Sequence, residues 1–311
     1  MNHAKIKSKA MCLRYLAVPL VYLILAFVPF CVSTYYVSLI MSILYWTTLA
    51  FSWFFFSGQT NYASLGSAAF LGMGAYIMAI LSNVTSIPII LGVVCLMSFL
   101  TAFIIGLVTL RLRGIYFAMF TLGLCELLKN SILWWEVNVS GTVGRWTISF
   151  NLETVYYFIL GFNLIFLLLF GFLLNSKLGL GLKAIGENEE AAEHLGVNTS
   201  LYKTLGFAIS TIPFGLIGAC LSTRWIYIDP RGSFDTTYSF MPAIMVLLGG
   251  TESAYAPLIS AMILSVLAEF LLVSFRDLYM LILGSVLLVL LTIFPGGLSG
   301  VILKIKKART R

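Results

Sequence analysis

Long apolar runs follow one another along almost the whole chain, separated by short breaks at charged residues, glycine, proline or asparagine. A helix needs about 20 apolar residues to cross a bilayer core that is about 30 Å thick. Runs of this kind recur and predict about ten membrane segments. The segments lie near residues 15–32, 36–56, 68–83, 87–109, 115–133, 156–174, 204–225, 238–250, 254–274 and 278–294.

This pattern predicts an all-α polytopic membrane protein with about ten transmembrane or re-entrant helices. Segment 238–250 is too short to cross the bilayer upright, so we expect a broken or re-entrant element there. The pattern leaves open whether residues 57–70 cross the bilayer or re-enter it. Irregular backbone at membrane depth is stable only where it is buried in protein or lines a cavity.

The composition excludes the main alternatives to a helical membrane protein. The chain of 311 residues is 60% hydrophobic and 10% charged, whereas soluble domains carry about 25% charged residues. A membrane β-barrel would show alternating segments of about ten residues, and the unbroken apolar run 156–174 excludes it. The basic N-terminus followed by residues 15–32 resembles a signal peptide. Because another apolar run follows at once, we expect a retained first helix.

The net charge of +7 is placed to orient the chain in a membrane rather than to bind nucleic acid. Basic residues gather at both termini and beside helix ends, and such residues favour the cytoplasmic side. We therefore expect a multi-pass protein of the cell inner (cytoplasmic) membrane with both termini in the cytoplasm. Residues 134–155 then form the main outer loop, and residues 175–203 form the main inner loop.

The residue types that usually carry catalysis or metal binding do not cluster in this sequence. The five cysteines lie in or beside apolar runs without paired spacing, and His3 and His194 are far apart. The chain has no G-x-x-x-x-G-K-[ST] phosphate loop, and no Ser-His-Asp or Cys-His arrangement is visible. We expect neither an enzyme nor a metal or cofactor site, so any ATP hydrolysis would take place on another protein.

The inner loop concentrates charge in the stretch GENEEAAEHLGVNT, residues 186–199. Residues 178–195 are mostly good helix formers without proline, and Gly196 is typical of a helix end. In a single helix, Ile185, Ala192 and Leu195 would share one face. These features alone leave two interpretations open, a solvated loop helix or a docking element for a cytoplasmic partner.

Small and polar residues are dense in residues 57–76, at membrane depth. Gly72 and Gly74 favour close helix packing. The buried amides of Gln59 and Asn61 need partners, and we expect a broken helix that lines a translocation path. Glu126 lies inside the fifth segment, three residues before Lys129. Such a carboxylate forms a local ion pair or serves in gating or a subunit interface.

Several sequence blocks resemble the permease subunits of branched-chain amino acid ABC importers, the LivM-like family. The blocks are LGLGLKAIGENEEAAEHLGVNTSLYK (178–203), SGQTNYASLGSAAFLGMGAY (57–76) and LRLRGIYFAMFTLGLCELLKN (110–130) and, more loosely, MVLLGGTESAYAPLISA (245–261) and FPGGLSG (294–300). They occur in the order found in that family. The chain is identified as a member on this basis.

The resemblance implies an ABC importer permease bundle, with residues 1–311 forming a single transmembrane permease domain. Residues 178–196 would form a cytoplasmic coupling helix. The implied partners are a second permease subunit (a paralogue or a second copy), two cytoplasmic ABC ATPase subunits that hydrolyse ATP, and an extracytoplasmic solute-binding protein.

Candidate roles are assigned to residues, from the resemblance for the coupling segment and from polar residues at membrane depth for the translocation path. The residues expected to contact the ATPase are Ala184, Ile185, Glu187, Asn188, Glu189, Ala191, Ala192 and Gly196. The residues expected along the translocation path are Gln59, Asn61, Ser64, Ser67, Tyr116, Thr121 and Glu126.

The sequence departs from the family pattern at several of these positions. Leu180 and Gly186 replace two arginines of the coupling pattern, which leaves open whether the chain shares its ATPase with typical relatives. Asn61, Tyr62 and Ser67 also differ from the family residues.

The expected function is an ATP-driven importer permease for branched-chain, hydrophobic amino acids. Urea, short amides or another small solute remain alternatives within the family. An ion-coupled secondary carrier that works alone is the alternative from a different class.

Overall fold

The structure is a computed structural model that describes residues 21–253, 255–275, 278, 281–282 and 284–285. Helices account for nearly all of the regular structure. A first helix spans Val21–Cys31. The helices that follow are α2 (Thr34–Trp53), π-helical η1 (Phe54–Gly58), α3 (Ser67–Leu81), α4 (Ile87–Thr109), α5 (Ile115–Trp135), π-helical η2 (Glu136–Ser140), α6 (Leu152–Leu174), α7 (Lys177–Glu187), α8 (Glu189–His194), α9 (Thr199–Trp225), α10 (Pro230–Ser233), α11 (Thr237–Gly249) and α12 (Ala256–Ser274).

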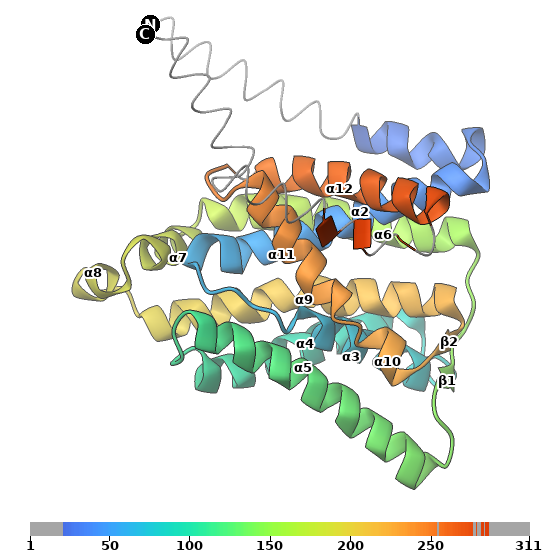
Figure 1. The fold of residues 1–311 in the computed structure, drawn as a ribbon, viewed down its shortest axis with the longest axis horizontal. Helices are drawn as coiled ribbons and strands as arrows, with labels where there is room; N and C mark the ends of the chain where they lie inside the picture. The colour runs from blue at the N-terminus through green and yellow to red at the C-terminus, as the bar shows by residue number, and fades with distance from the viewer. Residues whose placement is uncertain (1–20, 254, 276–277, 279–280, 283, 286–311) are drawn as a thin grey trace, which may run out of the picture.

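The helices form an elongated bundle with different structures at its two ends (Figure 1). Helices α7 and α8 lie at one end, called here the α7–α8 end. At the opposite end, strand β1 (Arg145–Trp146) pairs in antiparallel fashion with strand β2 (Tyr227–Ile228). This is the β1–β2 end.

Helix α9 forms the centre of the bundle and packs most extensively against α3 and α4. Glycines permit the close approach. A Cβ atom added at Gly74 would lie 2.0 Å from the carbonyl oxygen of Gly215, and one added at Gly218 would lie 2.0 Å from that of Leu71. Because small residues let helix backbones approach closely, the packing role predicted for Gly74 is confirmed.

In the described part of the chain, six helices are long and apolar enough to cross a membrane. They are Thr34–Gly58, Ile87–Thr109, Ile115–Ser140, Leu152–Leu174, Thr199–Trp225 and Ala256–Ser274. An all-α polytopic membrane protein is therefore confirmed, whereas the count of about ten spanning or re-entrant helices is not.

The difference in count has identifiable sources. Predicted segments 68–83 and 238–250 correspond to α3 and α11, which have 15 and 13 residues. Both are shorter than the roughly 20 residues that a helix needs to cross the bilayer. Predicted segment 15–32 lies partly outside the described residues, and 278–294 lies mostly outside them.

An interruption separates α2 and η1 from α3. Residues 61–66 are not helical, and Asn61 has a φ of 59°, an unusual left-handed value for a residue other than glycine. Figure 1 shows this stretch returning from the α7–α8 end towards the middle of the bundle, where α3 begins. The broken helix expected within residues 57–76 is therefore present.

Candidate functional site

The prediction of a single helix over residues 178–195 is wrong, because the helix is interrupted at Asn188. Its backbone is extended (φ −160°, ψ 110°), and this residue ends α7 and begins α8. The Asn188 side chain accepts a hydrogen bond from the Ala191 backbone N–H at 3.1 Å. Asparagine is among the preferred N-cap residues, which explains why a new helix starts here.

The break changes which residues of the inner loop are buried. Ile185 and Ala192 are buried, as their predicted shared face requires, but Leu195 is 83% exposed. Leu195 follows α8 directly as its C-cap, so it no longer continues the face of α7. Gly196 has a φ of +84°, which confirms the predicted helix end, since glycine readily adopts this conformation.

The eight residues predicted for ATPase coupling differ in exposure. Ile185 and Ala192 are buried, Ala184 and Glu189 are half-buried, and Glu187, Asn188, Ala191 and Gly196 are exposed. The segment therefore has a side fixed against the bundle and a side open to a partner.

Glu189 does not face outward but joins a polar cluster with Tyr62 and Lys203. The Lys203 Nζ donates to Glu189 Oε1 at 2.6 Å and to the Tyr62 hydroxyl at 3.2 Å. The Tyr62 hydroxyl in turn donates to Glu189 Oε2 at 2.6 Å. The backbone carbonyl of Leu110 also accepts from Lys203, at 3.1 Å. The non-helical segment 61–66, helix α8 and the turn after α4 thus all contact the buried Lys203 side chain of α9.

The ionised form of Glu189 is favoured in this cluster. Burial alone would raise the pKa of its carboxyl group. Hydrogen bonds from Lys203 and Tyr62, together with the positive charges of Lys203 and Arg113, outweigh burial and lower the pKa below its ordinary value. Glu189 and Lys203 therefore form a charged pair rather than a neutral one.

A second contact lies beside the cluster. The Asn61 side-chain amide donates to the Gly186 backbone carbonyl at 2.8 Å. A Cβ atom added at Gly186 would lie 1.9 Å from the carbonyl oxygen of Gln59. Glycine is therefore required at position 186 by this close approach, and an arginine side chain would not fit in this arrangement.

The residues predicted for a translocation path fall into three groups. Gln59 and Asn61 line a polar groove of about 620 Å³ at the α7–α8 end, together with Lys183, Glu187 and Glu252. This groove is large enough for a small solute.

The second group is buried inside the packed chain. Ser64, Ser67 and Thr121 are all buried. The Thr121 hydroxyl accepts from the Leu65 backbone N–H at 3.0 Å and donates to the Ala118 carbonyl at 2.9 Å. The Ser64 hydroxyl has no hydrogen-bond partner among the described residues. These side chains lie where they can hold or adjust the interrupted segment.

The third group lies on the outer face of α5. Tyr116 is 73% exposed. Glu126 accepts a hydrogen bond from Lys129 at 2.6 Å, so the local ion pair predicted from their spacing is present. The structure does not bring these residues to the groove that Gln59 and Asn61 line.

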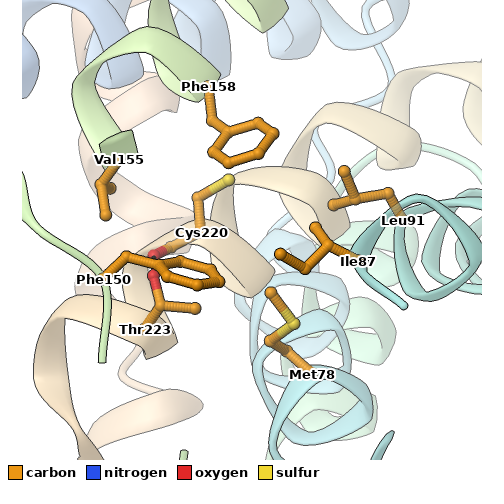
Figure 2. Close-up of a pocket in the computed structure, with 8 residues that line it drawn as sticks. All are labelled: Met78, Ile87, Leu91, Phe150, Val155, Phe158, Cys220 and Thr223. Carbon is orange, nitrogen blue, oxygen red and sulfur yellow. Dashed lines mark hydrogen bonds between the residues drawn. The ribbon is translucent and has the colours of Figure 1, made fainter. Parts of the chain in front are cut away.

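A further pocket lies near the β1–β2 end, between α3, α4, α6 and α9 (Figure 2). It measures about 10 Å³ and is almost wholly apolar. It is lined by Met78, Ile87, Leu91, Phe150, Val155, Phe158, Cys220 and Thr223. Because a single water needs about this much space, the pocket is too small for an amino acid in this conformation.

The sequence pattern indicates only that Lys203 orients the chain, whereas the structure places it at the centre of this cluster. A sequence signal of this second role is its position within the first turns of a long apolar helix, α9. A lysine is almost never fully buried unless it is paired, and Lys203 is only 4% exposed.

Among the described residues, no group of three or more His, Cys, Asp or Glu is placed to hold a metal ion.

The chain is a helical membrane bundle with an interrupted helix that is fixed to a polar loop at one end. Transporters use such discontinuous helices at their binding sites. The chain belongs to the branched-chain amino acid transport system / permease component family, whose model matches residues 35–291. That family consists of transport components, in agreement with the prediction that the chain is not an enzyme.

Two relatives carry the name high-affinity branched-chain amino acid transport system permease protein LivM, one from Escherichia coli K12 and one from Salmonella typhimurium LT2. Each is 27% identical over 275 residues. The match covers 78% of this chain and 64% of each relative, so the chain spans less than two thirds of their length. No solved structure matches the chain significantly.

Proposed function

We propose that the chain is the transmembrane permease subunit of an ATP-driven ABC importer for branched-chain, hydrophobic amino acids. Membership of the permease family supports this proposal, as does the similarity to two LivM proteins. The main structural support for a coupling role is that the α7–α8 segment has one side buried against the bundle and one side exposed. Its inner side is anchored to the bundle through Glu189, and its outer side is free to meet an ATPase.

Two cytoplasmic ABC ATPase subunits would dock at the α7–α8 end. Leu180 and Leu195 are 61% and 83% exposed there, and apolar contact with a partner would remove both side chains from water. Ala191 is exposed and small, which permits a close approach. In this proposal the α7–α8 end and both termini are cytoplasmic, and the membrane is the cell inner membrane.

A second permease subunit, either a paralogue or a second copy, would cover α5. In an apolar stretch of 18 residues within Ile115–Ser140, which comprises α5 and η2, only 17% of the stretch is buried inside the chain. The corresponding share in Thr199–Trp225, helix α9, is 83%. The partly exposed pair Glu126 and Lys129 lies on this helix, and charged groups are costly against lipid. Tyr116, Thr121 and Glu126 would then lie near the path between the two permeases.

An extracytoplasmic solute-binding protein would deliver the solute at the β1–β2 end. Trp134 and Trp146 are 64% and 72% exposed there. Gln59 and Asn61 would line the cytoplasmic part of the path, with Ser64 and Ser67 deeper along the same interrupted segment.

The substrate assignment is tested by uptake of radiolabelled leucine in cells that express the permease, its partner permease, the ATPases and the binding protein. We expect unlabelled valine and isoleucine to compete for uptake, whereas urea and acetamide do not. Competition by urea or acetamide without competition by valine would assign the permease to a different solute.

The partner assignment is tested by purifying the permease and measuring the ATPase that accompanies it. We expect Leu195→Asp to reduce the copurified ATPase at least about tenfold, because a carboxylate would replace a buried apolar contact. Val84→Asp is the matched control, since Val84 is 77% exposed in the loop before α4 at the opposite end. Equal ATPase recovery from both variants would contradict docking at Leu195.

A further inference from the structure

The two sides of the Asn188 break contact two consecutive residues of the interrupted segment. Gly186, the tenth residue of α7, accepts the hydrogen bond from Asn61. Glu189, the first residue of α8, accepts the hydrogen bond from Tyr62. These partners are 125 and 127 residues apart in the sequence. The contacts together form what is called here the 61–62 clamp, which comprises Asn61, Tyr62, Gly186, Glu189 and Lys203.

Lys203 makes the clamp costly to open. Its side chain is only 6% exposed, and the side chain of Glu189 is only 15% exposed. The ammonium also lies 4.6 Å from the centre of the Tyr62 ring, an arrangement that adds cation–π attraction. Removing one partner of a buried ion pair leaves an uncompensated charge. Helix α8 therefore cannot move away from Lys203 without leaving the lysine without its counter-ion, and both members of this pair also hydrogen-bond to the Tyr62 hydroxyl.

The far side of the interrupted segment is tied to other helices. The Trp53 indole N–H donates to the Ser64 carbonyl at 2.8 Å, and the Leu65 N–H donates to Thr121 of α5. Helix α3 begins two residues after Leu65. A displacement at Tyr62 therefore reaches α2, α3 and α5 through contacts that the structure shows.

We propose that the 61–62 clamp makes α8 and the interrupted segment 61–66 move as one unit, so that movement of a docked ATPase reaches the membrane path. This inference rests on the proposed function. Tyr62, Glu189 and Lys203 are positioning residues in this role, because they act through the segment rather than on the solute. It also means that Glu189 contacts the bundle and not the ATPase.

The clamp is tested by the number of ATP molecules hydrolysed per solute imported, measured on the reconstituted complex. We expect Glu189→Gln and Tyr62→Phe to raise this ratio at least about threefold while the ATPase still copurifies. Glu153→Gln is the matched control, because Glu153 is an exposed carboxylate in the first turn of α6, at the β1–β2 end. The control should keep the wild-type ratio.

Exchanging the charges of Glu189 and Lys203 distinguishes loss of the ion pair from loss of folding, because a misfolded variant would not be rescued by the second change. We expect the double variant Glu189→Lys with Lys203→Glu to restore the ratio towards wild type, whereas each single change raises it. Wild-type ratios in Glu189→Gln and Tyr62→Phe would overturn the clamp. Failure of the unaltered complex to bind an ATPase or to import solute would instead overturn the proposed function.

A cross-link keeps the inference testable if the polar variants fail to assemble. Tyr62→Cys and Glu189→Cys, introduced together after replacement of the five native cysteines, would be joined by a short bifunctional thiol reagent. Because the double cysteine variant lacks the clamp, it should show a raised ratio of ATP hydrolysed to solute imported before the reagent is added. Joining the two thiols should lower the ratio towards wild type, and a ratio that stays raised or a loss of transport on joining would show that the two residues do not move as one unit.

Discussion

At position 186, the residue type is determined by a contact between α7 and the end of the helix that precedes segment 61–66. The family resemblance leads to an expectation of arginine there, yet Gly186 lies against the carbonyl of Gln59 and accepts a hydrogen bond from Asn61. Asn61 and Tyr62 also depart from the family pattern, and both contact the α7–α8 segment. The departures at 61, 62 and 186 therefore lie close together in space.

This close approach predicts the effect of adding a single carbon atom. We expect Gly186→Ala to lower the free energy of unfolding in detergent by about 1–3 kcal/mol, the usual cost of overpacking. Gly92→Ala in α4 is the control, since an added Cβ there meets no atom within 4 Å. Thermal unfolding followed by tryptophan fluorescence would measure both. Equal stability of the two variants would show that the 186 region rearranges freely.

The lowered pKa of Glu189 predicts how stability depends on pH. A carboxyl group whose pKa is lower in the folded state stabilises the fold above its unfolded pKa, and this contribution is lost as pH falls through the folded pKa. We expect wild type to exceed Glu189→Gln in unfolding temperature by a constant margin between about pH 5 and pH 8. The margin should shrink below about pH 4.5. A margin that grows on acidification would contradict the charged pair.

At the residue scale, the sequence indicates the small and polar residues but not their partners. Gln59, Asn61 and Glu189 are functional candidates from the sequence alone. The sequence does not pair Glu189 with Lys203 or with Tyr62, and the contact with Tyr62 joins residues 127 positions apart. Such contacts depend on how distant elements pack, which no local pattern encodes.

At the element scale, the long helices follow directly from the apolar runs. The predicted segment 87–109 coincides with α4, and 156–174 ends where α6 ends. The prediction fails where an element is short or capped. Asn188 divides α7 from α8 because its side chain caps a new helix, and asparagine is among the preferred residues at such a position.

Helix α5 differs from the other long helices in how little of it the chain itself covers. If a second permease lies on α5, a photoreactive thiol reagent attached to a cysteine at Met119 should form a cross-link between the two permeases in native membranes, once the five native cysteines have been replaced. Met119 is 64% exposed on that helix. Leu168→Cys, which is 54% exposed on α6, is the matched control and should remain unlinked. Cross-linking from position 168 but not from 119 would place the subunit interface elsewhere.

At the scale of the whole molecule, the bundle presents different surfaces at its opposite ends (Figure 1). Its β1–β2 end presents aromatic side chains, and its α7–α8 end presents a segment anchored on one side and exposed on the other. The central helix α9 connects both ends and carries Lys203 near its start. The interrupted segment and α8 are joined through Lys203, and in the proposed mechanism this link carries movement of a partner at the α7–α8 end to the interior of the bundle.

The energy source of transport tests the central claim most directly. The permease would be reconstituted in proteoliposomes with its partner permease and ATPases, with binding protein and radiolabelled leucine outside. We predict uptake only when ATP and the ATPases are present at the α7–α8 side, and no uptake when an ion gradient replaces ATP. Uptake by this chain alone, driven by a proton or sodium gradient without any ATPase, would contradict the claim.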